Sequence, residues 1–160
     1  MKPEEQVKPG DDKFIWKKMP SHLFVYGSLR SESAHPMARR LAASARLVGK
    51  ASAPGMLYDF GAYSGARFGP EHKRDVIGEV FALPDDGRLL ATLDGFEGTA
   101  NENAISASFE RITIKVKLAS GGTVEALTYA LRAPPRKSRP IASGDFIAHL
   151  RRRKPRMAPP

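Results

Sequence analysis

Residues 23–30 read LFVYGSLR, an apolar run that stops at a glycine and a serine and then turns polar. The β-branched and aromatic side chains of residues 23–26 predict a buried β-strand. Gly27 permits backbone angles that other residues resist, and it allows a ligand to approach the main chain closely. Successive N–H groups in such a turn can form a nest for a carboxylate or an oxyanion. The turn therefore either binds an anion or merely ends a core strand.

A second informative stretch, residues 88–98, reads RLLATLDGFEG. Its apolar spacing predicts a short helix over residues 88–93 that breaks at Gly95. Glu97 then follows an aromatic ring and precedes a glycine, and it is either a functional carboxylate or a surface carboxylate in a loop. Asp94 is best explained as a hydrogen-bonding residue at the end of this helix.

Taken together, YGSL at residues 26–29 and LDGFEG at residues 93–98 resemble the γ-glutamylcyclotransferase family in its AIG2-like branch. Further pieces follow in the order that this family shows: GMLYD at 55–59, VIGEVF at 76–81, FER at 109–111 and a late strand that ends at Tyr129. The many short strands, the hairpin turns and the few helices predict an α+β fold. The resemblance implies a small mixed β-barrel with short helices packed around it and a pocket at one end.

The reaction that the resemblance implies is cyclisation of a γ-glutamyl group to 5-oxoproline, with release of the amine attached to the γ-carbonyl. The substrate's own α-amine is the nucleophile, so neither a catalytic serine or cysteine nor a cofactor is needed. The resemblance makes Glu97 the catalytic acid and base. The backbone N–H groups of Gly27, Ser28 and Leu29 suit the substrate's α-carboxylate or a developing oxyanion.

Tyrosines and one further carboxylate complete the set of candidate site residues. Tyr26, Tyr129 and Tyr58 either line the substrate pocket or are ordinary buried tyrosines of barrel strands. Glu79, within a predicted strand, is a second candidate for a buried functional carboxylate, although pairing with Arg111 explains it equally well. These residues therefore keep two interpretations each.

Two features depart from the family pattern. Phe109 stands two residues before the arginine, where the family usually has tyrosine, and the polar loop 99–108 is longer than the pattern leads us to expect. The missing hydroxyl at Phe109 puts the substrate, or activity itself, in question.

A turn is also predicted within the first half of the chain. Pro54-Gly55 predicts a turn between a strand over residues 46–51 and a strand over residues 56–60.

Composition bounds the remaining possibilities. With 160 residues the chain has the length of one domain with a sizeable core. It contains no cysteine, and its four histidines are scattered, so we expect no disulfide, no thiol nucleophile and no metal site. No apolar run approaches the length of a membrane span. The charged N-terminal segment lacks the apolar core of a secretory signal, so we expect a cytoplasmic protein.

The net charge of +9 is unevenly distributed. Residues 132–160 hold nine lysines and arginines but one acidic residue, and therefore carry almost the entire excess. We expect a flexible N-terminal arm over residues 1–20, a cyclotransferase-like domain over 21–132 and a basic extension over 133–160 with room for a helix at 145–153. A basic extension is either an anion-binding tail, for example for nucleic acid, or a solvated appendage.

Three functions of different classes remain open at this point. The first is an enzyme that acts on a small γ-glutamyl amide, the second a non-catalytic small-ligand-binding module of the same fold. The third is a nucleic-acid-associated protein that acts through its basic extension. Glu97 favours the first over the second, and the nearly neutral domain and the scarcity of aromatic residues in the extension argue against the third. Neither the leaving amine nor the oligomeric state follows from the sequence.

Overall fold

The barrel is assembled from strands that lie far apart in the chain. The computed structural model describes residues 22–61, 63–85, 87–97, 109–137 and 139–153. In chain order the elements are β1 (His22–Val25), α2 (Pro36–Ser44), β2 (Arg46–Asp59), β3 (Ser64–Phe68), β4 (Asp75–Ala82), α3 (Arg88–Glu97), β5 (Phe109–Leu118), β6 (Thr123–Leu131), β7 (Arg139–Pro140) and α4 (Phe146–Arg153). The expected arm over residues 1–20 and the loop 99–108 lie outside the described residues.

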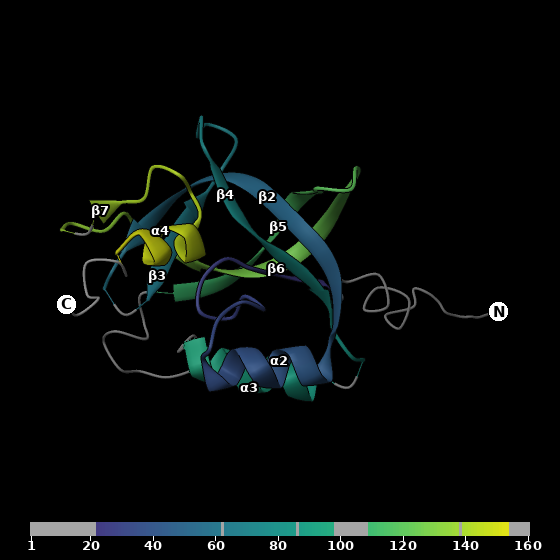
Figure 1. The fold of residues 1–160 in the computed structure, drawn as a ribbon. Coiled ribbons are helices and arrows are strands. Elements are labelled where there is room, and N and C mark those ends of the chain that lie inside the picture. Colours follow the sequence, from purple (N-terminus) through teal and green to yellow (C-terminus); the bar gives the residue numbers. More distant parts are fainter. Residues whose placement is uncertain (1–21, 62, 86, 98–108, 138, 154–160) are drawn as a thin grey trace.

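The sheet runs in the order β3-β2-β4-β1-β6-β5, and a further pairing of β2 with β5 closes five of these strands into a barrel. The pairing of β1 with β6 is parallel, while the other pairings are antiparallel. The long strand β2 forms part of the barrel wall, and its C-terminal part also pairs with β3 and with β7 outside the barrel (Figure 1). The expected α+β fold with a small mixed barrel is therefore confirmed.

Two apolar cores lie on opposite sides of the barrel wall, because side chains alternate along a strand. Phe24 of β1 points into the barrel, where it meets Val80 and Val116. Leu23 and Val25 point outward and pack with Leu41 of α2 and Leu93 of α3. Figure 1 shows α2 and α3 together beneath the barrel, while α4 lies on another side, where its His149 pairs with Asp59 of β2 at 2.8 Å.

The expected turn at Pro54-Gly55 is wrong, because β2 passes through it as one continuous strand. Pro54 lies opposite Asp75 of β4, just beyond the point where β2 leaves β5 and joins β3. The missing N–H of proline is tolerated there because β2 is changing partners. Gly55 is needed for space, since a Cβ at this position would lie 2.5 Å from the carbonyl oxygen of Arg67.

The expected end of the second helix is also wrong, because α3 continues through Gly95 to Glu97. Gly95 does not adopt a positive φ, so it does not act as a helix stop. The Asp94 side chain accepts hydrogen bonds from the barrel, as described below, and these bonds hold the last turn. No helix within the described ranges is long and apolar enough to cross a membrane.

The C-terminal region is packed further than the expected boundary at residue 132. The short strand β7 pairs with β2, and Ile141, Phe146 and Ile147 are buried. The helix expected over residues 145–153 is present as α4, with Asp145 at its N-terminal end. The described body of the protein therefore extends to residue 153, and α4 covers one end of the barrel interior through Phe146.

Candidate functional site

Among the described residues, the turn after β1 is held by hydrogen bonds that do not use the N–H groups of Gly27, Ser28 and Leu29. The N–H of Arg30 donates to the carbonyl oxygen of Gly27 at 3.0 Å, which closes the turn. The carboxylate of Glu79 accepts hydrogen bonds from the N–H and the hydroxyl of Ser31, both at 2.7 Å. Within the described residues, the N–H groups of Gly27, Ser28 and Leu29 meet no acceptor. Three such donors in one turn fit the anion-binding interpretation of its sequence, and binding of an anion there stays a prediction.

The sequence offered an ion pair with Arg111 as one explanation of Glu79, but the structure shows Glu79 bonded to Ser31. Only 3% of Glu79 is exposed, and its two carboxylate oxygens are both used by Ser31. The Arg111 guanidinium instead pairs with Asp94 of α3. The pairing of Glu79 with Arg111 is therefore wrong, and Glu79 fixes the backbone that follows the turn.

Gly27 is required for space rather than for an unusual backbone angle. Its φ is not among the positive values found at other glycines of the chain. A Cβ built on Gly27 would lie 2.6 Å from the hydroxyl oxygen of Ser64, the first residue of β3. Ser64 was missed in the sequence, where a serine between a tyrosine and a glycine carries no distinctive signal.

Arg30, at the end of the turn, is a buried cation tied to the start of α4. Its side chain is 2% exposed and donates to the Asp145 carboxylate at 2.7 Å. The same carboxylate oxygen accepts from the N–H of Ala148 at 3.1 Å, so Asp145 caps α4. Burial alone would raise the pKa of Asp145. The hydrogen bond from Ala148, the hydrogen bond and charge of Arg30 and the N–H of Ile147 together lower that pKa below its ordinary value.

A hollow of about 530 Å³ lies between the loop that follows the turn and α4; we call it the α4 hollow. Ser28 and His35 line it from the loop side, and Phe146 and Arg151 line it from α4. Arg151 pairs with Glu32 at 3.5 Å, and both of these side chains also line the hollow. The turn therefore opens, through Ser28, on a hollow with an apolar wall and a charged pair.

The end of α3 lies beside the same hollow. The ring of Phe96 packs edge-on against His35, with ring centroids 4.9 Å apart. His35 is held in place as the N-cap of α2, because its Nδ1 accepts from the N–H of Met37 at 3.0 Å. Glu97 follows Phe96 as the last residue of α3, and its side chain lies outside the described part of the structure. Glu97 is therefore the chain neighbour of Phe96, which contacts His35 in the wall of the α4 hollow.

Asp94 anchors this end of α3 to the barrel. It accepts a hydrogen bond from the Tyr129 hydroxyl at 2.7 Å and pairs with the Arg111 guanidinium. Arg111 and Tyr129 face each other across β5 and β6 in the strand register. Asp94 therefore is a hydrogen-bonding residue near the helix end, as expected, and its partners fix α3 relative to the barrel.

The predicted tyrosines are buried or half-buried around the turn. The Tyr26 hydroxyl donates to the carbonyl oxygen of Tyr129 and accepts from the N–H of Ala66 at 3.2 Å. Tyr129 and the half-buried Tyr58 belong to the outer apolar core, which also contains Leu29. Tyr58, Tyr129 and Leu29 thus share the outer core, while Tyr26 lies in the inner core and reaches the backbone of Tyr129 through its hydroxyl. Contact of any of them with a substrate stays a prediction.

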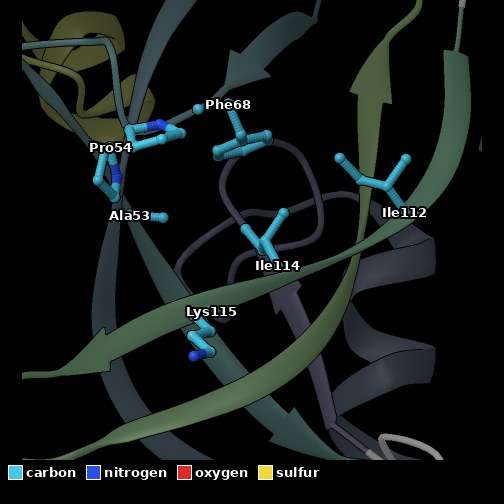
Figure 2. Close-up of a pocket in the computed structure, with 8 residues that line it drawn as sticks. Ala53, Pro54, Phe68, Ile112, Ile114 and Lys115 are labelled. Carbon is cyan, nitrogen blue, oxygen red and sulfur yellow. The ribbon is translucent and has the colours of Figure 1, made fainter.

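A second hollow lies where β5 and β2 separate, and it contains none of the predicted site residues. Its volume is about 360 Å³, and Ala53, Pro54, Phe68, Ile112 and Ile114 give it apolar walls. Figure 2 shows Phe68 of β3 facing Ile114 of β5 across this space. Lys115 is the one ionisable side chain among its lining residues. With so few polar groups, this hollow offers little for recognition of a charged γ-glutamyl group.

One family model and several solved structures are similar to this chain. The family model described as "Gamma-glutamyl cyclotransferase, AIG2-like" matches residues 23–148. The solved structure of YkqA from Bacillus subtilis is 25% identical with a TM-score of 0.65, over 86% of this chain and 43% of that chain. This chain therefore spans less than half the length of YkqA.

Two further solved structures share the fold at lower identity. An AIG2-like protein from Mus musculus is 20% identical with a TM-score of 0.58, over 72% of this chain and 79% of that chain. A gamma-glutamyl cyclotransferase is 19% identical with a TM-score of 0.53, over 73% of this chain and 68% of that chain. No curated protein matches this chain.

Proposed function

Because this chain belongs to the gamma-glutamyl cyclotransferase, AIG2-like family, we propose that it converts the γ-glutamyl group of a small amide or peptide into 5-oxoproline and releases the attached amine. In this reaction the α-amine nitrogen of the substrate bonds to the γ-carbonyl carbon, and the bond from that carbon to the leaving nitrogen breaks. A proton passes from the attacking to the leaving nitrogen. The observation that carries the proposal is the rigid turn with three free N–H groups, which opens on the α4 hollow.

The turn supplies the orientation that this cyclisation needs. The N–H groups of Gly27, Ser28 and Leu29 would hold the substrate's α-carboxylate, so that the neighbouring α-amine faces the γ-carbonyl. A well-aligned intramolecular attack reaches effective molarities of about 10⁵ M or more. Such alignment requires a turn that does not move, and the bonds from Glu79 and Arg30 support that requirement.

Glu97 is the residue that we propose as the general acid and base. A free glutamate, with a pKa of about 4.3, is a poor acceptor for a proton from an ammonium group. Burial beneath a bound substrate would raise the pKa and make the carboxylate a better base. The contact between Phe96 and His35 supports the assignment, because it brings this end of α3 to the wall of the α4 hollow. The anchoring of Asp94 would keep the helix end in register with the turn.

The leaving amine would extend into the α4 hollow. Phe146 gives this hollow an apolar wall, while Glu32 and Arg151 give it one negative and one positive charge. An amine with an aliphatic or aromatic body suits such a lining. The identity of that amine stays open among amino acids, lysine side chains, polyamines and carrier-bound groups.

The test is 5-oxoproline release from a panel of γ-glutamyl compounds, measured for the wild type and for Glu97→Gln. Glutamine keeps the size and hydrogen-bonding capacity of glutamate but removes the base, so turnover should fall about 100-fold or more. The matched control is Glu125→Gln, which makes the same change on an exposed residue of β6. Full turnover in Glu97→Gln would assign the base to another residue, and the buried Glu79 would be tested next.

One observation favours the alternative of a non-catalytic binding module. Phe109 is 5% exposed and packs in the outer core with Tyr129, so the hydroxyl that the family usually carries here is replaced by apolar packing. A wild type that binds 5-oxoproline but releases none from any γ-glutamyl compound would support this alternative. Phe109→Tyr is the informative variant, because a gain of turnover on restoring the hydroxyl would identify the lost group.

A further inference from the structure

Ser64 carries a buried hydroxyl that no residue in the described part of the chain hydrogen-bonds. The residue is 8% exposed, and its oxygen meets no hydrogen-bond partner among the described residues. Leaving a buried polar group without a partner opposes folding, so most such groups in native proteins are paired. An alanine at this position would pack as well without that cost. The hydroxyl therefore calls for an explanation outside the folded chain.

The position of this hydroxyl supplies the explanation. A Cβ on Gly27 would meet the Ser64 oxygen at 2.6 Å, so the hydroxyl lies directly against the turn. The N–H groups of Gly27, Ser28 and Leu29 also lack acceptors within the described ranges. Two independent sets of unused hydrogen-bonding groups, from β3 and from the turn after β1, thus lie side by side.

We propose that the Ser64 hydroxyl is a further substrate-binding group, which donates a hydrogen bond to the carboxylate held at the turn. This inference rests on the proposed function, because that function places the substrate's α-carboxylate at these N–H groups. Ser64 would add a side-chain donor to the three backbone donors. The ligand class is a carboxylate, one oxygen of which accepts this hydrogen bond. A neutral lactam without a carboxylate would gain no affinity from the hydroxyl.

The experiment compares the wild type with Ser64→Ala, using 5-oxoproline and 2-pyrrolidinone as probes. The dissociation constant for 5-oxoproline should rise about tenfold or more in Ser64→Ala, the usual scale for a hydrogen bond to a charged group. The constant for 2-pyrrolidinone, which has the same ring but no carboxylate, should not change. The midpoint of thermal unfolding should stay constant or rise, because the variant removes an unpaired buried hydroxyl. Ser52→Ala, a half-buried serine of β2, is the matched control and should change neither constant.

The outcomes separate this inference from the function on which it rests. If the wild type neither binds 5-oxoproline nor releases it, the proposed function falls, and the role of Ser64 falls with it. If the wild type binds and Ser64→Ala binds equally well, the function stands and the inference is wrong. A drop in the unfolding midpoint of Ser64→Ala well beyond that of Ser52→Ala would show that the hydroxyl serves the fold, which also overturns the inference.

Discussion

Replacing Asp145 with asparagine removes one negative charge from beside a buried arginine while leaving the cap of α4 in place. Asparagine is as good an N-cap as aspartate, so the bond from the N–H of Ala148 should persist. Its side-chain oxygen can still accept from Arg30. The variant therefore isolates the charge of the pair between Arg30 and Asp145.

The magnitude follows from how deeply the arginine is buried. Arg30 is 2% exposed, and its Nε has no partner within the described structure, so few other groups can stabilise its charge. Removing one member of a buried ion pair outright costs about 3–5 kcal/mol. The retained hydrogen bond to asparagine recovers part of this, so we expect a loss of about 1–3 kcal/mol in the free energy of unfolding. Asp145→Ala also loses the cap and should cost about 1 kcal/mol more.

The assay is urea denaturation followed by circular dichroism, repeated over a range of pH. The pKa of Asp145 is lowered from 3.8 in the folded state, so its stabilising contribution is present above that value. It is lost as the pH falls through the folded-state pKa. The difference between the wild type and Asp145→Asn should thus be constant above about pH 5 and shrink below 3.8.

The control is Glu110→Gln, because Glu110 pairs with Arg132 at 3.7 Å where both side chains are about half exposed. Such a surface pair contributes at most about 1 kcal/mol. If Asp145→Asn costs no more than this control, or if its effect does not depend on pH below 3.8, the reasoning about the buried charge is refuted.

Three other variants test the packing of the fold. Phe146→Ala should cost about 3–5 kcal/mol in denaturant unfolding, because this ring is 2% exposed inside the barrel core. Gly78→Ala should cost about 2 kcal/mol or more, since the added methyl would lie 2.2 Å from the carbonyl oxygen of Val25, and an unchanged midpoint would contradict the close approach. Truncation after Arg153 should leave unfolding unchanged, as the buried C-terminal residues precede it. If residues 132–160 bind nucleic acid, the affinity measured by fluorescence anisotropy should fall steeply with added salt.

Local signals in the sequence were sufficient for many of the elements. The apolar run before Gly27 predicted β1, and the hairpin between β5 and β6 turns at Gly121 and Gly122, which both adopt the positive φ angles that favour glycine. These features depend on residues close in the chain, so composition and spacing reveal them. Pro54 misled the prediction because its position in the sheet, where β2 changes partners, depends on strands elsewhere in the chain.

In the candidate site, too, the sequence revealed the local feature but not the partners that lie far away in the chain. The turn at residues 26–29 was singled out from its own sequence, and its N–H groups meet no acceptor among the described residues; anion binding there stays a prediction. The groups that hold it were not found, because Arg30 and Asp145 are 115 residues apart and Glu79 lies 48 residues from Ser31. Ser64 could not be placed against Gly27 without the register of β3. Residue type alone does not reveal such partners.

The central place of β1 in the barrel sets an order in which the protein can be made. This strand is translated before β6 and α4, so the Tyr26 hydroxyl waits 103 residues for the carbonyl of Tyr129, and Arg30 waits 115 residues for Asp145. Contacts of such long range form slowly and leave early segments exposed during synthesis. A nascent chain that stops before Asp145 has the turn but not the carboxylate that pairs with Arg30. The turn is therefore translated well before the residues that give it its final shape.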